Sequence, residues 1–423
     1  MDELWRDLSK QELSARKEEL NKKYQEIKEL GLNLNISRGK PSADVLDLSN
    51  DILKGLDTYY TEDGTDVRNY GVPTGIPECK KLFSGLLDIP QDKLVVGGNA
   101  SLSHMYNIYS ILYLFGPPGF EPWSKLPEVK FLCPVPGYDR HFAISEDFGT
   151  TMINVPMTED GPDMNIVEDL VKNDDSIKGI WCVPLYSNPE GVVYSDDTVK
   201  RLAQMETAAD DFRIFWDNAY GVHHIYEKHE IADIMKFAEQ AGYPDRVYYF
   251  FSTSKITFPG GGIGLFASGD NNIKQMKAHI GKQTIGYDKI TQLKTVKYFK
   301  NPQGIHDHMK KIADILRPKF DLVLDKLEAE FGDTDLLSWV TPKGGYFVSV
   351  DTMDGCAKEV VAMAKEAGAT LTGAGATFPY KKDPKDRNIR IAPTFTDMDE
   401  LEKTIDLLCI CIKLVSIDKI LRN

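Results

Sequence analysis

The sequence predicts an α/β protein with a three-layer major domain, in which helices cover a mostly parallel sheet, and a smaller α+β domain. Between about residues 80 and 300, short apolar runs alternate with helical patterns. Such alternation is typical of a parallel sheet with helices on its faces. From about residue 305 the order of the elements changes. Because 423 residues exceed what one compact core usually holds, we expect two or three domains.

The major domain is predicted at residues 46–304, and its strands are predicted from apolar runs. Helical patterns lie between several of these runs, as at 99–115 and 196–209. In a sheet of this kind the ligand lies beyond the carboxyl ends of the strands. We expect Trp181, Trp216, Tyr59 and Tyr60 to be packing residues. The predicted strands lie within residues 93–98, 129–138, 151–157, 177–186, 212–220, 246–254 and 262–268.

The smaller domain is predicted to combine both ends of the chain, residues 1–45 and 305–423. Residues 9–31 carry an amphipathic helical pattern that ends at a glycine. A long helix is expected at 305–331. Shorter strands and helices follow it, and a last helix is expected at 397–420.

Composition and charge exclude several classes of function. The net charge is −14, so the chain lacks the basic surface that nucleic acids and anionic membranes require in a partner. No stretch of 18 apolar residues and no signal-peptide pattern occurs, so we expect a soluble, cytoplasmic protein. The six cysteines form no CxxC pair, and the histidine pairs lack further ligands at suitable spacing. We therefore expect no metal site.

Polar residues follow several of the predicted strands, at the point where each strand ends. Because the carboxyl ends of parallel strands meet at one edge of a sheet, we expect these side chains to lie close together. A single polar residue after a strand is usually turn chemistry, whereas the ordered set indicates a ligand site. The set comprises Asn99, Ala100, Ser101, Tyr138, Asn188, Asp217, Tyr220, Ser252, Ser254 and Lys255.

Lys255 is the residue in this set with the most distinctive surroundings. It follows an apolar run, stands among hydroxyls in "STSK", and precedes a glycine-rich turn. Burial of a lysine favours its neutral amine, which is the nucleophilic form. The turn "GGNAS" opens a predicted helix, so the backbone N–H groups of Ala100 and Ser101 are expected to favour a phosphate.

Taken in order, these residues resemble the fold-type I enzymes that use pyridoxal phosphate (PLP), specifically class I-like aminotransferases. The resemblance is closest to the bacterial group called aspartate aminotransferase type Ic. It extends over nearly the whole chain, and together its motifs are specific. They are "NYGVPTGIPECKKLF", "GGNASL", "PVPGYDRH", "YSNPEGVVYS", "WDNAYGVHH", "STSKITFPGGG" and "RIAPTF".

The resemblance implies a three-layer PLP-transferase domain and a role for each matching residue. Lys255 matches the lysine that forms the Schiff base with PLP and moves the substrate proton. Asp217 is expected to pair with the protonated ring nitrogen. Asn188 and Tyr220 match the residues that hydrogen-bond the ring oxygen. Tyr138 matches the aromatic residue that stacks on the ring.

The same resemblance implies a phosphate site. Ala100, Ser101, Ser252 and Ser254 match its donors, and Tyr70 matches a tyrosine that reaches the phosphate of the neighbouring subunit. The family usually has an arginine one turn after the Schiff-base lysine. Here that stretch reads "ITFPGGGIGLF" and contains no basic residue. The hydroxyls before Lys255 are candidates to compensate.

For the substrate, Arg390 matches the arginine that grips the α-carboxylate with its two-pronged guanidinium. Three basic residues are candidates to read a second carboxylate. Lys289 stands 34 residues after Lys255 and is expected to act in the partner's site. Arg38, which Gly39 follows in "SRGKPS", and Arg140 are the others, and Gly39 is expected at the substrate site with Arg38.

The predicted activity is transamination between an L-amino acid, best aspartate, and a 2-oxo acid, best 2-oxoglutarate, in a homodimer with shared active sites. Two other interpretations of the function stay open. One is another PLP enzyme of the same fold, such as an α-aminoadipate-type aminotransferase or a C–S lyase. The other is a PLP-binding regulatory domain, which the acidic chain and the short segment before the fold disfavour.

Overall fold

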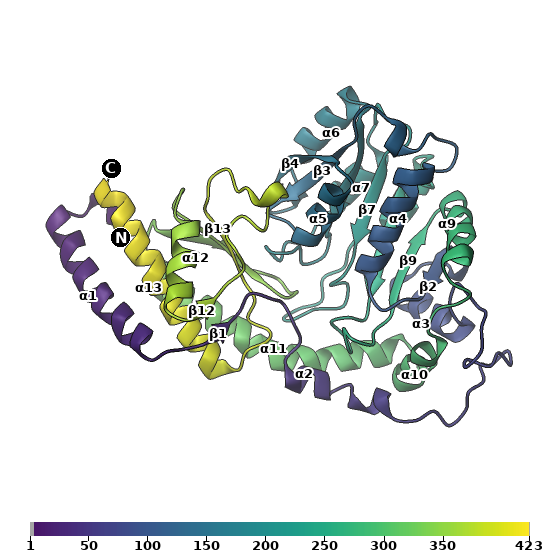
Figure 1. The fold of residues 1–423 in the computed structure, drawn as a ribbon, viewed down its shortest axis with the longest axis horizontal. Helices are drawn as coiled ribbons and strands as arrows, with labels where there is room; N and C mark the ends of the chain where they lie inside the picture. The colour runs from purple at the N-terminus through teal and green to yellow at the C-terminus, as the bar shows by residue number, and fades with distance from the viewer. Residues whose placement is uncertain (1–3, 423) are drawn as a thin grey trace.

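The computed structural model describes residues 4–422, and its largest element is an eight-stranded sheet (Figure 1). The strand order is β2-β9-β8-β7-β6-β3-β4-β5. The central strands β8, β7, β6, β3 and β4 run parallel, so the predicted mostly parallel sheet is confirmed. The strands are Leu94–Val96 (β2), Lys130–Val135 (β3), Thr151–Thr158 (β4), Gly161–Pro162 (β5), Ile177–Cys182 (β6), Arg213–Asp217 (β7), Val247–Ser252 (β8) and Gly264–Ser268 (β9).

Helices cover both faces of this sheet, which makes three layers. Successive strand residues point to opposite faces, so on β7 Phe215 joins one core while Ile214 and Trp216 join the other. Helices α4, α5 and α9 pack on the first face, and α3, α6, α7 and α8 on the second. These helices are Pro77–Leu87 (α3), Ser101–Phe115 (α4), Asp139–Asp147 (α5), Met164–Asn173 (α6), Asp196–Gln204 (α7), Ile234–Gln240 (α8) and Asp270–Gln283 (α9).

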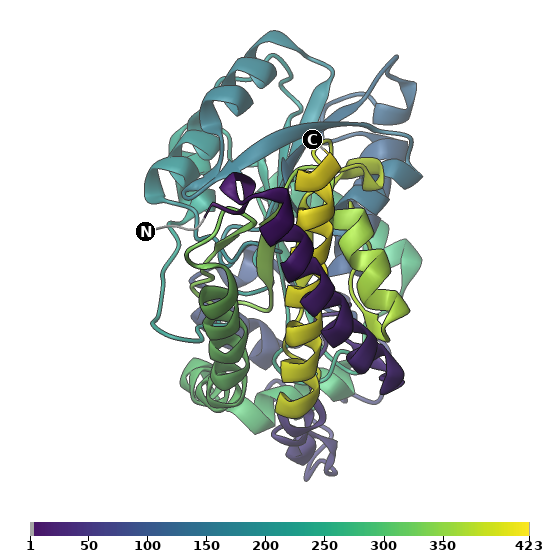
Figure 2. The same ribbon diagram turned by 90° about the vertical axis from the view of Figure 1, so that its left-hand side faces the viewer.

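A second, smaller group of elements contains residues from both ends of the chain. Strands Leu337–Val340 (β10), Val348–Thr352 (β11) and Asn388–Ile391 (β13) form an antiparallel sheet, and Leu34–Asn35 (β1) pairs in parallel with Ala369–Thr370 (β12). Helices Lys10–Glu29 (α1) and Met398–Arg422 (α13) lie side by side (Figure 2), tied by an ion pair between Lys17 and Asp418. Helix Ala357–Glu366 (α12) packs against α13 and is hydrogen-bonded to α1, where the Tyr24 hydroxyl donates to the carbonyl of Met363.

The two groups are joined by the helices Ala43–Asp47 (α2), Lys289–Phe299 (α10) and Pro302–Phe331 (α11). The large sheet lies within the predicted 46–304 segment, and the small sheets lie outside it. The division at residues 46 and 304 stays a prediction, and residues 1–3 and 423 of the predicted smaller domain lie outside the described residues. None of the helices within residues 4–422 is long and apolar enough to cross a membrane.

No bounds were predicted for several helices of the major domain, α9 and α10 among them, and one prediction about side-chain packing was wrong. Trp181 and Trp216 are buried as expected. Tyr59 and Tyr60 are 45% and 53% exposed, so their prediction as packing residues was wrong. An aromatic side chain alone does not fix burial, since both lie in a loop without a helix or strand to cover it.

Candidate active site

A cleft of about 500 Å³ opens at the carboxyl ends of the parallel strands, where the large sheet meets β13 and the β1 and β12 segments. Eight of the predicted site residues line it, from six different parts of the chain. The predicted residues in its lining are Arg38, Gly39, Tyr138, Arg140, Asn188, Tyr220, Lys255 and Arg390. Ser101 and Asp217 lie deeper, in a hollow that shares Tyr138, Asn188, Tyr220 and Lys255 with the cleft.

Parallel strands bring the deep residues together. Asp217 is the last residue of β7, Asn188 follows β6, and Lys255 follows β8. Strand β7 hydrogen-bonds to β6 on one side and β8 on the other, so these three strand ends are neighbours. This is the arrangement expected from the order of polar residues in the sequence.

The Asp217 carboxylate is buried, and only one of its two oxygens has a hydrogen-bond partner among the described residues. Its Oδ2 lies 3.0 Å from Nε2 of His141, whose ring stacks on Trp181 with ring centroids 4.5 Å apart. Its Oδ1 has no hydrogen-bond partner among the described residues, although Asp217 is only 3% exposed. A buried carboxylate oxygen without a donor is costly, so Oδ1 is positioned to accept a hydrogen bond from a bound molecule.

Lys255 lies at the floor of the cleft with its amine over two tyrosine rings. Its Nζ is 4.9 Å from the ring centre of Tyr220 and 5.9 Å from that of Tyr346. Burial lowers the pKa of the Lys255 ammonium below its usual value, and Asp217 opposes this shift. A lysine with a lowered pKa has more neutral amine near neutral pH, which suits attack on a carbonyl carbon.

Two buried phenols border the deep part of the cleft. Burial raises the pKa of Tyr220 well above its usual value, and Tyr138 and Asp217 nearby raise it further. Burial also raises the pKa of Tyr138. Both phenols therefore stay protonated at neutral pH and remain hydrogen-bond donors.

The predicted phosphate donors gather at the start of α4. The helix begins at Ser101 and its N-cap is Ala100, so unpaired backbone N–H groups face outward there. Ser252 donates to Ser254 over 3.2 Å, and Ser254 reaches the carbonyl of Asn99 at 3.5 Å. The two serines therefore stand beside the helix N-terminus.

The segment after Lys255 packs tightly against the turn before α4. It contains no basic side chain that would bind a phosphate there. A Cβ added at Gly264 would lie 2.6 Å from the carbonyl carbon of Ala100, so only glycine fits there. The Gly97 N–H donates to Gly264 O, and the Gly264 N–H donates to Gly98 O. Residues 256–264 contain no basic residue, so a charge for a phosphate would have to come from another segment.

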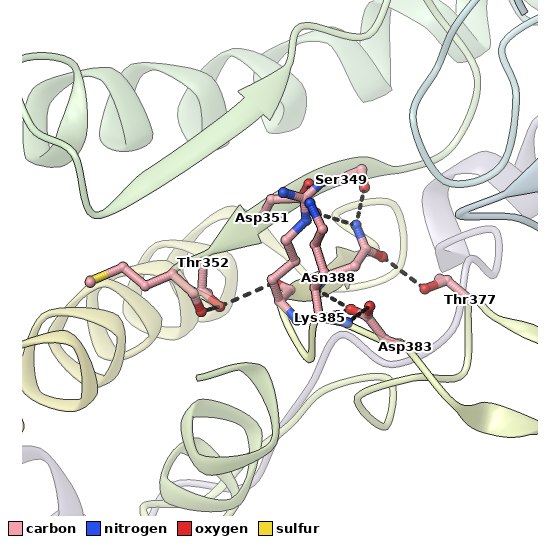
Figure 3. A network of polar contacts seen from close by, with 9 residues as sticks. Ser349, Asp351, Thr352, Thr377, Asp383, Lys385 and Asn388 are labelled. Atoms are coloured by element: carbon pink, nitrogen blue, oxygen red, sulfur yellow. Dashed lines mark hydrogen bonds and ion pairs between the residues drawn. The ribbon is translucent and has the colours of Figure 1, made fainter. Parts of the chain in front are cut away.

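Arg390 lies on β13, opposite Ser349 of β11. Its neighbour on the same strand face, Asn388, donates to Ser349 Oγ and Asp351 Oδ1, both at 2.9 Å, and accepts from Thr377 at 2.8 Å (Figure 3). These bonds hold the end of β13 in place. The carbonyl of Thr377 in turn accepts from the N–H of Gly137, one residue before Tyr138. The network therefore links the strand of Arg390 to the loop of Tyr138.

The Arg390 guanidinium is held by side chains from three other segments. Nη1 donates to Asp139 Oδ1 and to Asn188 Oδ1, each at 3.2 Å, and Nη2 donates to Thr372 Oγ1 at 3.5 Å. The ring of Phe347 lies 4.7 Å from Cζ. Such a fixed fork suits recognition of a planar carboxylate.

Two of the predicted residues lie away from this chain's own cleft. Tyr70 is 78% exposed and shares a surface hollow with Gly286, Tyr287 and Lys289. Lys289 is the first residue of α10, is 5% exposed, and donates from Nζ to the carbonyl of Gly71 at 3.1 Å. The roles of Tyr70 and Lys289 in the site of another subunit stay predictions.

The sequence reasoning did not assign a role to several residues that complete the site. These include His141 and Asp139, both in the motif "PVPGYDRH". Their spacing, three and one residues after Tyr138, places both on the first turn of a helix at a strand end and was the available signal. Tyr346 and Phe347 come from the smaller group of elements and gave no such signal. Within residues 4–422, no group of three or more potential metal ligands gathers.

Comparisons with known proteins agree with this geometry. The model of the family described as aspartate amino-transferase matches residues 8–423. An aspartate aminotransferase of Corynebacterium glutamicum is 44% identical over 403 residues, which cover 94% of this chain and 93% of that protein. A crystal structure of an aspartate transaminase from the same species superposes with a TM-score of 0.96 at 42% identity, covering 99% of this chain and 100% of that one.

A more distant structure shares the fold. An α-aminoadipate aminotransferase of Thermus thermophilus is 18% identical and superposes with a TM-score of 0.75, covering 91% of this chain and 93% of that one. The family match and the relatives at 44% and 42% identity agree over nearly the whole chain. The chain therefore belongs to the aspartate amino-transferase family and is an aminotransferase.

Proposed function

We propose that the cleft binds PLP and that the protein transfers the amino group of L-aspartate to 2-oxoglutarate by a ping-pong reaction. PLP supplies a carbonyl carbon that condenses with amines and a ring that withdraws electrons from the substrate carbon. The observation that carries the proposal is the buried, unpaired Asp217 Oδ1 beside the partly desolvated Lys255. A protonated ring nitrogen is the donor that this oxygen lacks.

The other residues around the cleft fit the same cofactor. The N-terminus of α4, with Ser252 and Ser254 beside it, suits a phosphate. Asn188 and Tyr220 can donate to a ring oxygen, and Tyr138 offers an aromatic face. We infer that Ala100 and Ser101 donate to the phosphate through their backbone N–H groups, and that Ser101 adds its hydroxyl.

In this proposal each side chain has one task in the reaction. Lys255 holds the cofactor and then moves a proton from the substrate α-carbon, because its lowered pKa leaves a basic amine. Arg390 orients the substrate through its α-carboxylate. Asp217, held by His141, keeps a negative charge at the ring nitrogen.

The choice of substrates rests on the relatives and on charge. The relative at 44% identity is an aspartate aminotransferase. Arg38 and Arg140 line the cleft, with Gly39 next to Arg38. We propose that the substrate passes these two basic side chains as it enters. Lys289 of the neighbouring subunit remains the predicted partner for the second carboxylate, with Arg38 and Arg140 as alternatives.

A homodimer is part of the proposal, because Tyr70 and Lys289 lie outside their own chain's cleft. Apolar side chains next to Lys289 are exposed, Ile285 by 63% in the preceding loop and Ile290 by 41% on the first turn of α10. Exposed apolar patches of this kind often mark protein interfaces. Sedimentation should show a dimer, and a fully active monomer would contradict the shared site. The predicted cytoplasmic location stays a prediction.

The test of function is a steady-state assay of glutamate formation from aspartate and 2-oxoglutarate after loading with PLP. Parallel double-reciprocal plots are expected, because the first product leaves before the second substrate binds. A preference for 2-aminoadipate would move the assignment to that substrate class, and release of sulfide from cysteine without amino transfer would indicate a C–S lyase.

The role of Lys289 has its own test. Lys289→Ala should lower the specificity constant for aspartate by about 2–4 kcal/mol in transition-state free energy and leave that for alanine nearly unchanged. An equal loss for both would mean that the bond from Lys289 to Gly71 supports the loop or the dimer. No loss for either would favour Arg38 or Arg140.

A further inference from the structure

The guanidinium of Arg390 already holds a carboxylate in this structure. Nη1 uses both of its N–H groups, one on Asp139 and one on Asn188, each at 3.2 Å. The Nε atom is buried and has no partner among the described residues. A carboxylate that binds both Nη atoms must therefore displace one of the two acceptors on Nη1.

Asp139 is the acceptor that can leave. Its side chain is 33% exposed, whereas Asn188 is 3% exposed and lies between the cleft and the hollow of Asp217. Asp139 is also charged, so it repels an incoming carboxylate while Asn188 does not. The two acceptors thus differ in both exposure and charge.

A second guanidinium stands next to Asp139. Oδ2 of Asp139 lies 3.9 Å from Nε of Arg140, which is 55% exposed. Asp139 is therefore a carboxylate between two arginines, one buried and one at the rim of the cleft. Among the described residues that line the cleft it is also the one acidic side chain, beside several basic ones.

We propose that Asp139 is an internal counter-ion of Arg390 that the substrate α-carboxylate displaces, and that Arg140 receives Asp139 when the substrate binds. The proposal rests on the proposed function, since it assumes that substrates bind Arg390. In the free protein Asp139 stabilises the buried guanidinium, which would be costly to leave unpaired. When substrate is present Asp139 competes with it, weakens the binding of every α-carboxylate, and replaces the product as it leaves. Asp139 is a positioning residue and takes no part in the chemistry.

The test compares carboxylate binding to the PLP-loaded protein by titration calorimetry, with succinate and propionate as unreactive probes. Asp139→Asn should lower the dissociation constants of both probes by about five- to tenfold, the effect of removing one partly screened like charge. Asp139→Ser, which also suits the first turn of a helix, should act in the same direction. Glu146→Gln makes the same charge change at an exposed position on the same helix and should alter both constants less than about twofold.

Arg140→Gln tests the exchange of partner. It should raise the dissociation constants of succinate and propionate alike, by about two- to fivefold, because Asp139 loses its alternative partner. In the Asp139→Asn background the same change should have no effect on propionate. The KM values for aspartate and alanine should follow the binding constants, while kcat stays the same or falls.

An unchanged or weaker affinity of Asp139→Asn for both probes would overturn the counter-ion role and show that Asp139 only orients Arg390. An effect of Arg140→Gln on succinate alone would overturn the exchange and place Arg140 at the second carboxylate. Failure of the wild-type protein to form glutamate from aspartate contradicts the proposed function instead. Normal wild-type activity with unchanged probe binding in Asp139→Asn contradicts the counter-ion alone.

Discussion

Asp217 and Asp139 are two carboxylates near the same tyrosine, Tyr138, and the protein holds them in opposite ways. Asp217 is buried at a strand end, is held by His141 on one oxygen, and has no partner for the other among the described residues. Asp139 is partly exposed on the first turn of α5 and pairs with Arg390 and Arg140. One oxygen of Asp217 lacks a donor, whereas Asp139 accepts a hydrogen bond from Arg390 and lies within ion-pair distance of Arg140.

The difference follows from where each residue lies in the fold. Asp217 ends β7 between two neighbouring strands, so the sheet fixes its position and excludes water. Asp139 begins a helix at the rim, where a side chain can change partners at little cost. A fixed buried charge suits a cofactor that stays bound, whereas an exchangeable charge suits a substrate that enters and leaves.

The largest expected effect concerns Lys255, which lines both the cleft with Asp139 and the hollow with Asp217. Lys255→Ala should lower kcat for transamination by about 10⁴-fold or more, because it removes both the covalent attachment and the proton carrier. The circular dichroism spectrum should be unchanged, which shows that the fold persists. Retention of more than a few per cent of the activity would remove Lys255 from the chemistry.

Asp217→Asn tests the buried carboxylate. The amide keeps the shape but loses the charge that favours a protonated ring nitrogen, so kcat should fall by about 10²–10³-fold and PLP should bind more weakly. His141→Asn should have a smaller effect in the same direction, because it removes only the group that holds Asp217. Equal activity of Asp217→Asn and wild type would mean that this carboxylate is structural.

Arg390→Lys tests the substrate side of the comparison. Lysine keeps the charge but lacks the planar guanidinium that donates two hydrogen bonds to a carboxylate. The specificity constants of all amino-acid substrates should therefore fall together, each by a loss of about 2–3 kcal/mol in transition-state stabilisation. Aspartate and alanine serve as the pair to compare, since both present an α-carboxylate. Unequal losses would show that Arg390 reads the side chain of the substrate.

The smallest expected effect is on stability and comes from two histidines near the site. Burial lowers the pKa of His223 to about 3 and that of His224 to about 4. The unfolded chain therefore binds more protons than the folded one between these values and about 6.5, the ordinary histidine pKa. The free energy of unfolding is expected to fall as pH drops below about 6.5, by up to about 1.4 kcal/mol per pH unit for each group.

His223→Gln should reduce that slope, because glutamine has no proton to take up in the unfolded state. Denaturant titrations of wild type and variant at pH 7 and pH 5 give the comparison. An unchanged slope would mean that His223 is protonated in the folded protein, against its burial beside Tyr346 and the carbonyl of Lys255.

The site residues that follow strands of the large sheet could be predicted from the sequence. Asn188, Asp217 and Lys255 follow apolar strands, and the parallel sheet brings them together as expected. The helix start at Ser101 was equally readable from its glycine turn. These positions depend on local pattern and on one rule of parallel sheets.

The surroundings of Arg390 could not be predicted from local sequence patterns. Arg390 is hydrogen-bonded to Asp139 and Asn188, and only the packing of the smaller group of elements against the large sheet brings these two residues to it. The network around Asn388, which holds the end of β13, joins residues that are 11 to 39 positions apart along the chain. The family resemblance supplied Arg390, but not the carboxylate that it holds.

The most direct test of the site is borohydride reduction of the PLP-loaded protein followed by peptide mapping. Reduction traps the cofactor on the lysine that holds it. If Lys255 and Asp217 form the cofactor site, the phosphopyridoxyl label should appear on the peptide that contains Lys255, at about one label per chain. Label on a different lysine, or no label under conditions in which the protein forms glutamate from aspartate, would contradict this assignment.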